Sequence, residues 1–286
     1  MTARPAPIVR FAVVESTQTT AFDLAAEGAV DGTVVVADHQ SAGRGRRGRA
    51  WTDAPGTSLL ASILVRPRVP PSLLGTFSIA TGVAVAEALR RATGIEARLK
   101  WPNDVLAHGR KLAGILVESR IGADGRAGVS EPRRALGAHD DPGVSEPPRA
   151  SLRPPTVDAG LAAPVTLIVG VGLNLTQRTF PVDLADLATS VVIETGRAPD
   201  RDAMLEALLQ EFDAWRWRLE SQGFGQVRER WLARSDTIGR RVTVDAVTGV
   251  AVGLDGDGAL LVDDGRSVQR IVAGAIAPEV TDAPRR

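Results

Sequence analysis

Segments with helical spacing of apolar residues alternate with strand-like segments along the first 223 residues. This alternation restricts the fold more than any other feature of the sequence. Apolar residues with helical spacing occur at 15–29, 73–94 and 200–223, and Ser16 or Thr17 is expected to cap the first of these helices. β-Branched, strand-like runs lie between them, at 9–14, 32–40, 57–67, 96–120 and 164–175. After residue 236 only short alternating strands remain, divided by the turns "VTG", "DGDG" and "DDG". The pattern predicts a larger domain of strands and helices, followed by a small β-barrel that is SH3-like in size.

The two domains are expected to meet near residue 236. The first spans residues 8–235, and the barrel spans residues 237–280. Residues 121–164 interrupt the first domain: they are rich in Pro, Gly, Ala and Arg, and they repeat "GVSEPRRA" as "GVSEPPRA". Such a segment buries too little apolar surface to offset its ordering entropy. We therefore expect a disordered insertion in a surface turn between two strands.

Composition argues against several classes of protein. The chain has no cysteine, which excludes disulfides and thiolate metal sites, and its three scattered histidines argue against a zinc site. No run reaches the roughly 18 apolar residues of a membrane span, and the first residues lack the layout of a signal peptide. We expect a cytoplasmic protein without a membrane partner. The formal net charge of +0 argues against a dedicated nucleic-acid binder.

The segment "GRGRRGR" at 43–49 nevertheless concentrates four arginines and three glycines. Its glycines have the spacing of a dinucleotide-binding loop, but that motif needs a helix to open at the third glycine. Here "RAWTDAPGTS" follows, with Pro55 and Gly56, and the acidic residue expected about 20 positions further on is missing. Nucleic acid, a nucleotide phosphate and a solvated loop are the possible interpretations. Glycine N–H groups together with arginine forks suit a phosphate.

Only two of the 34 basic residues are lysines, Lys100 and Lys111, and both lie in "RLKWPNDVLAHGRKLAGILVES". Codon bias explains the general excess of arginine. A lysine that persists under such bias favours a site that needs a compact point charge rather than a planar fork. The segment predicts a strand, a turn and a second strand, with Lys111 at the mouth of the second. Gly114 permits the close approach of a ligand or another backbone.

In this order, "GRGRRGRAW", "KWPNDV" followed by "KLAGILVE", and "GVGLN" resemble the biotin protein ligases. "EST" at 15–17 stands where that family has its Ser-Thr-Asn motif, and the C-terminal barrel is also similar. The resemblance covers about residues 8–120 and 165–280. It implies an α+β fold with a mixed-sheet catalytic domain of the biotin/lipoyl ligase type plus the SH3-like barrel. Two features depart from the family: Gln18 replaces the Asn of the motif, and residues 121–164 are additional.

The resemblance also implies roles for individual residues. Lys111 and Arg44 would be catalytic and would contact the biotin carboxylate and the α-phosphate. The biotin-binding residues would be Ser16, Thr17, Gln18, Gln40, Arg44, Gly45, Arg46, Lys111 and Gly114. The ATP-binding residues would be Arg46, Arg47, Arg49, Trp51, Trp101, Asn103, Asp104 and Asn174. The sequence does not identify a metal ligand.

The implied reaction joins biotin and ATP as biotinyl-5'-AMP and then transfers biotin to a carrier lysine. Because two anions must meet in the first step, cationic side chains and Mg²⁺ would offset their repulsion. A closing loop would keep water from the hydrolysable adenylate. The partner would be the biotin carboxyl carrier domain of a biotin-dependent carboxylase, and the ligase would be a monomer or a homodimer.

Two alternatives stay open. A lipoyl or octanoyl transferase would use a related fold, although the arginine-rich loop and the barrel favour biotin. An RNA- or DNA-binding protein would interleave aromatic residues for base stacking, but the chain has no tyrosine and only 4% aromatic residues. About eight residues precede the first strand. This leaves no room for a winged helix, so we expect no specific DNA binding.

Overall fold

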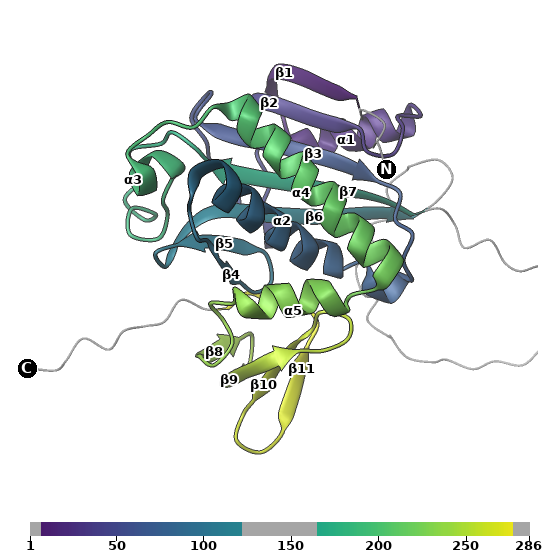
Figure 1. Cartoon of the computed structure of the whole chain (residues 1–286), viewed down its shortest axis with the longest axis vertical. Helices are drawn as coiled ribbons and strands as arrows, with labels where there is room; N and C mark the ends of the chain where they lie inside the picture. The colour runs from purple at the N-terminus through teal and green to yellow at the C-terminus, as the bar shows by residue number, and fades with distance from the viewer. Residues whose placement is uncertain (1–6, 122–164, 277–286) are drawn as a thin grey trace, which may run out of the picture.

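A seven-stranded mixed sheet forms the centre of the protein (Figure 1). The computed structural model describes residues 7–121 and 165–276. The strands lie in the order β1-β2-β3-β7-β6-β5-β4. Their bounds are β1 Ile8–Val14, β2 Val34–Gln40, β3 Ser58–Val65, β4 Arg98–Lys100, β5 Asp104–Ala107, β6 Arg110–Ile121 and β7 Val165–Asn174. β1 pairs with β2 in parallel and the other neighbours are antiparallel, which confirms the expected mixed sheet.

Helices cover both faces of this sheet. α2 (Thr76–Thr93) and α4 (Arg201–Gln222) pack together on one face, and α1 (Thr17–Ala26) lies on the other (Figure 1). Successive strand residues point to opposite faces, so Val34 joins the large core under α2 and α4 while Val35 joins the small core under α1. Among the described helices, none combines the length and the apolar character needed to cross a membrane.

The C-terminal part forms a separate antiparallel sheet with the strand order β11-β10-β9-β8. Its strands are β8 Arg241–Val244, β9 Val247–Leu254, β10 Leu260–Asp263 and β11 Val268–Ile271. This small sheet agrees with the expected SH3-like barrel. α5 (Gly225–Ala233) lies between the two sheets (Figure 1). The chain then runs beside β4, because Leu99 N donates to Arg234 O and Asp236 N donates to Leu99 O, each at 2.8 Å. We keep residue 236 as the proposed boundary.

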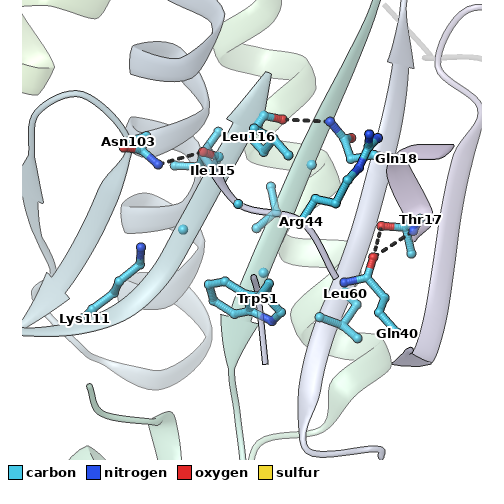
Figure 2. Close-up of a pocket in the computed structure, with 15 residues that line it drawn as sticks. Thr17, Gln18, Gln40, Arg44, Trp51, Leu60, Asn103, Lys111, Ile115 and Leu116 are labelled. Carbon is cyan, nitrogen blue, oxygen red and sulfur yellow. Dashed lines mark hydrogen bonds between the residues drawn. The ribbon is translucent and has the colours of Figure 1, made fainter. Parts of the chain in front are cut away.

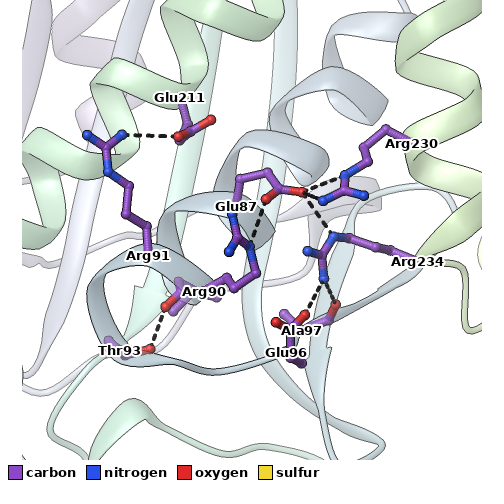
Figure 3. A network of polar contacts seen from close by, with 10 residues as sticks. Glu87, Arg90, Arg91, Thr93, Glu96, Ala97, Glu211, Arg230 and Arg234 are labelled. Atoms are coloured by element: carbon purple, nitrogen blue, oxygen red, sulfur yellow. Dashed lines mark hydrogen bonds and ion pairs between the residues drawn. The ribbon is translucent and has the colours of Figure 1, made fainter.

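A cluster of charged side chains holds α5 against α2 (Figure 3). The Glu87 side chain, 7% exposed, accepts hydrogen bonds from Arg230 Nε at 2.6 Å, Arg90 Nε at 3.1 Å and Arg234 Nε at 3.1 Å. Arg234 also donates to Glu96 at 2.9 Å. Burial alone would raise the pKa of Glu87, but the hydrogen bonds from Arg230 and Arg90 outweigh it and hold this pKa below its usual value. The cluster therefore fixes α5, which leads into the barrel, to the large domain.

The three helices expected from helical spacing are confirmed as α1, α2 and α4. Gly94 ends α2 in the left-handed conformation with φ 77°, and the Asp200 side chain caps α4 by accepting from Ala203 N. Ser16 takes the expected N-cap position of α1, but the expected cap bond is absent because its hydroxyl accepts no helix amide. The Gln40 side chain accepts from the first helix amide, Thr17 N, at 2.7 Å.

The insertion expected at 121–164 lies outside the described residues, apart from Ile121, as do residues 277–280 of the expected barrel. Ile121 ends β6 and Val165 begins β7, and these two residues are register partners on adjacent antiparallel strands. The segment therefore connects two neighbouring strands, as expected. α5, α3 (Val191–Thr195) and the short 3₁₀ turns η1 (Arg46–Gly48) and η2 (Pro71–Leu73) lie outside the expected elements.

Candidate active site

A pocket lies over the middle of the large sheet, where the segment that follows β2 crosses β3, β7 and β6 (Figure 2). The structure brings the expected catalytic and biotin-binding residues together there, except Ser16 and Arg46. Ser16 directly precedes Thr17 of the lining. Arg46 lies outside the lining but donates to Asn103, which belongs to it. The lining comprises Thr17, Gln18, Gln40, Arg44, Gly45, Trp51, Leu60, Asn103, Lys111, Gly114, Ile115, Leu116, Gly170, Val171 and Gly172.

Two glycines on adjacent strands form the floor of the pocket. Gly114 of β6 and Gly172 of β7 are register partners, and the indole of Trp51 lies over both. A Cβ atom on Gly172 would lie 2.6 Å from Trp51 Cε2, and one on Gly114 would lie 3.0 Å from Trp51 Cζ3. The ring reaches the sheet only because both positions lack a side chain. The "GVGLN" motif, which by itself is compatible with simple packing, thus contributes to the pocket.

Hydroxyl and amide groups form one end of the pocket. Thr17 donates from its main-chain N at 2.7 Å and from Oγ1 at 3.0 Å to Gln40 Oε1 (Figure 2). Ser62 Oγ, buried on β3, lies 2.8 Å from Thr17 Oγ1 and 3.0 Å from Gln18 Oε1. The hydroxyl of Ser16 is buried and has no hydrogen-bond partner among the described residues. This end therefore presents polar groups that are buried and held in place by one another.

The structure accommodates Gln18, the residue that departs from the family motif. Its Nε2 donates to Glu118 Oε2 at 2.9 Å and to Leu116 O at 3.3 Å. A Cβ atom on Gly170 would lie 2.9 Å from Gln18 Oε1, so the absence of a side chain there makes room for the amide. The longer side chain is thus fully hydrogen-bonded without blocking Thr17 or Gln40.

Two cations reach the pocket, each already paired with a carboxylate. Lys111 Nζ lies 2.6 Å from Asp104 Oδ1 and 5.9 Å from the centroid of the Trp51 ring. Arg44 Nη2 lies 3.0 Å from Glu118 Oε2. A β-bulge between β5 and β6 opposite Val105 and Leu106 aims the end of β6 that carries Lys111. A neighbouring carboxylate thus holds each cationic group at the pocket.

The remaining arginines of the "GRGRRGR" segment do not line the pocket. Arg46 donates to Asn103 Oδ1 at 3.2 Å and to Gly274 O at 3.3 Å. Arg47, with a positive φ of 57°, forms two bonds to Asp245 of the barrel at 2.9 and 3.0 Å. Arg49 is exposed. The loop is therefore attached to the barrel, a contact that the sequence did not indicate.

Trp101 and Asn174, expected on the nucleotide side, lie outside the pocket. Trp101 is 2% exposed; its Nε1 donates to Gly258 O at 3.2 Å and its main-chain N donates to Thr237 Oγ1 at 2.9 Å. Asn174 is 5% exposed, and its Nδ2 donates to Thr189 O at 2.9 Å. Both side chains use their polar atoms inside the protein: Trp101 joins the barrel to the large domain, and Asn174 holds the loop that contains Thr189. Their expected role in nucleotide binding stays a prediction.

Ser62 and Glu118 contact the polar end of the pocket but were not expected there. Glu118 lies in the "KLAGILVES" strand and Ser62 in the "TSLLASILV" strand, and the resemblance assigned neither residue a role. Only the pairing of β3 and β6 on either side of β7 brings them near Gln18.

The fold and the pocket define a ligase of the biotin/lipoate type, and comparison with known proteins agrees. Residues 10–130 match the Biotin/lipoate A/B protein ligase family, and residues 237–277 match the Biotin protein ligase C terminal domain. The biotin--[acetyl-CoA-carboxylase] ligase of Mycobacterium tuberculosis is 35% identical over 279 residues, covering 92% of this chain and 87% of that protein. The corresponding ligase of Paracoccus denitrificans is 32% identical over 236 residues, covering 79% and 82%.

A solved structure gives the same result. Biotin protein ligase from Aquifex aeolicus in complex with biotin and ATP superimposes with a TM-score of 0.73 at 26% identity, covering 95% of this chain and 97% of that one. The chain belongs to the biotin protein ligase family.

Proposed function

We propose that this protein is a biotin–[carboxyl carrier protein] ligase, which activates biotin with ATP and transfers it to a lysine of a carrier domain. One observation carries the proposal: Lys111 and Arg44 line the same pocket as the hydrogen-bonding groups of Thr17 and Gln40. A bicyclic urea with an acidic tail needs this combination, because its ring requires directed donors and acceptors and its carboxylate requires cations.

In the first step a biotin carboxylate oxygen attacks the α-phosphorus of ATP, a phosphorus–oxygen bond forms, and pyrophosphate leaves. Lys111 and Arg44 would leave Asp104 and Glu118 and pair with the carboxylate and the α-phosphate. Cationic side chains placed at the reacting atoms stabilise the charge that develops there. The forked guanidinium of Arg44 suits the fixed geometry of a carboxylate. The single Lys111 Nζ suits an oxygen whose charge changes during the reaction.

At the other end of the pocket, Ser16, Thr17, Gln18 and Gln40 would orient the ureido ring. The unpaired hydroxyl of Ser16 supports this assignment, because a buried hydroxyl without a partner is costly and a ligand would satisfy it. Gly45 and Gly114 would allow close contact with biotin. Arg46, on the same loop as Gly45, would contribute indirectly, because it holds the pocket-lining Asn103 in place.

The nucleotide would lie toward Trp51 and Asn103, which line the pocket, with Asp104 beside them. Arg47 and Arg49 would contribute through the loop rather than by direct contact. The described ranges contain no group of three or more His, Cys, Asp or Glu side chains that could hold a metal ion. The carboxylate of Asp104 fits Mg²⁺, which one or two protein oxygens commonly hold together with substrate phosphates. When bound, Mg²⁺ would neutralise phosphate charge.

In the second step the amine of a carrier lysine attacks the acyl carbon of biotinyl-AMP, an amide forms, and AMP leaves. The partner would be the biotin carboxyl carrier domain of a carboxylase in the cytoplasm. The balanced charge of the chain, +0, favours this activity over sequence-specific DNA binding.

The test is incubation with ATP, Mg²⁺, biotin and an apo carrier domain, followed by a streptavidin blot. We expect ATP-dependent labelling of the carrier by the wild-type protein and none by Lys111→Ala. Lipoate serves as the competing substrate. Lipoyl transfer without biotinyl transfer would replace the proposal with the related activity.

A further inference from the structure

A buried carboxylate, Glu194, gathers three donors beside the strand that carries Lys111. Its side chain is 3% exposed. Arg110 Nη2 donates to Oε1 at 2.9 Å, Thr189 Oγ1 donates to the same oxygen, and His108 Nδ1 lies 2.5 Å from Oε2. Burial alone would raise the pKa of Glu194, but the hydrogen bonds from Thr189 and His108 outweigh it and lower this pKa. The carboxylate is therefore ionised at neutral pH.

Arg110 connects this carboxylate to the orientation of Lys111. The two residues are consecutive at the start of β6, and consecutive strand residues point to opposite faces. Arg110 reaches Glu194, whereas Lys111 reaches the pocket. Holding the guanidinium on one face therefore restricts the rotation of the strand end on the other.

Thr189 provides a second connection. Its main-chain N donates to Lys111 O at 2.9 Å, while Lys111 N donates to Leu187 O at 2.7 Å, so residues 187–189 pair with Lys111 as a parallel bridge. The carbonyl of Thr189 accepts from Asn174 Nδ2 at 2.9 Å. The Thr189 main chain thus joins the end of β6 to the end of β7, and its side chain is anchored on Glu194.

We propose that Glu194 is a positioning residue for Lys111, acting through Arg110 and Thr189; the catalytic part of this inference rests on the proposed ligase function. Glu194 lies behind the strand and outside the pocket lining. Without its charge, Arg110 loses a buried partner and residues 187–189 lose their side-chain anchor. Lys111 Nζ would then occupy its productive position for less of the time, and a displacement of about 1 Å at a reacting group can reduce a rate by about 100-fold.

Glu194→Gln tests the proposal, with Glu87→Gln as the matched control. Like Glu194, Glu87 is a buried carboxylate with three hydrogen-bond donors, and its side chain is 7% exposed. However, it lies at the junction of α2 and α5 (Figure 3). We expect Glu194→Gln to lower kcat for biotin-dependent ATP–pyrophosphate exchange by about 10- to 100-fold. KM for biotin should change by less than about threefold, because the polar end of the pocket is intact. The control should leave both constants near those of the wild type.

Amide hydrogen exchange supplies a readout that does not depend on activity. The amides of Lys111 and Thr189 form the bridge, so Glu194→Gln should accelerate their exchange and Glu87→Gln should not. If the wild-type protein lacks biotin-dependent exchange of pyrophosphate, the proposed function fails, while the amide measurement still decides whether Glu194 holds Lys111.

Two results would overturn the inference: an unchanged kcat in Glu194→Gln, or unchanged amide exchange at Lys111. Should Glu194→Gln give no soluble protein, Thr189→Val decides the question. This change removes the hydroxyl donor and keeps the main-chain bonds, and it should lower kcat by about tenfold while leaving KM for biotin unchanged. A wild-type kcat in Thr189→Val would exclude the positioning role.

Discussion

Replacing Trp101 with phenylalanine tests whether this side chain serves the junction with the barrel or the nucleotide. The indole is 2% exposed, and its Nε1 donates to Gly258 O at 3.2 Å. Gly274 of the barrel segment also lies beside the ring, since a Cβ atom there would be 3.7 Å from Trp101 Cζ3. Phenylalanine fills most of this space but lacks the N–H donor.

The expected cost follows from these contacts. Gly258 O would lose its donor in a buried setting, which costs about 1–3 kcal/mol. The smaller ring leaves a cavity that adds about 1 kcal/mol. The variant should therefore lose about 2–4 kcal/mol of unfolding free energy. At about 2–4 °C per kcal/mol for a chain of this size, its Tm should fall by about 5–15 °C.

Thermal denaturation followed by circular dichroism measures the loss, and ATP–pyrophosphate exchange measures KM for ATP. We expect Trp101→Phe to lower Tm and to leave KM for ATP within about twofold of the wild type. Trp51→Phe is the matched comparison, because Trp51 lines the pocket. A wild-type Tm together with a tenfold higher KM for ATP in Trp101→Phe would refute the reasoning and return Trp101 to the nucleotide side.

Four further outcomes are expected. Lys111→Ala should reduce biotin-dependent pyrophosphate exchange by at least about 100-fold, as for other preorganised charge-stabilising groups; near-normal exchange would remove Lys111 from its role. Arg44→Ala should release biotinyl-AMP faster in a filter assay, and an unchanged release rate would argue against a closing loop. Gly172→Ala should displace the Trp51 ring, whose Cε2 lies 2.6 Å from the added Cβ, and so shift the tryptophan fluorescence; an unchanged spectrum would contradict the contact. Glu87→Gln should cost about 1–3 kcal/mol at pH 7. Because the folded-state pKa of Glu87 is lowered, its contribution is present above the unfolded pKa of about 4.3 and is lost as pH falls through the folded pKa, so the difference from the wild type in urea denaturation should shrink as the pH is lowered below about 4.

Local patterns in the sequence predicted most of the fold and the centre of the site. The helices α1, α2 and α4 follow from apolar spacing, because a helix buries one face every 3.6 residues wherever it packs. Arg44, Lys111 and Gly114 were expected in one site, and they line one pocket together with Thr17 and Gln40. The short helix α5 was not expected, since its nine residues give a helical pattern few turns over which to repeat.

Contacts between distant parts of the chain decided the rest. Trp101 stands beside the "PND" turn, but the barrel encloses it and supplies the carbonyl of Gly258, 157 positions away. Arg47 binds Asp245, 198 positions away, rather than the pocket. The sequence by itself therefore predicted most of the helices and strands, the family and several residues that line the pocket, because these predictions depend on local spacing, residue type and the order of motifs. Only the tertiary structure decided which polar group each of these side chains meets, because that depends on where the sheet and the barrel bring remote residues into hydrogen-bond distance.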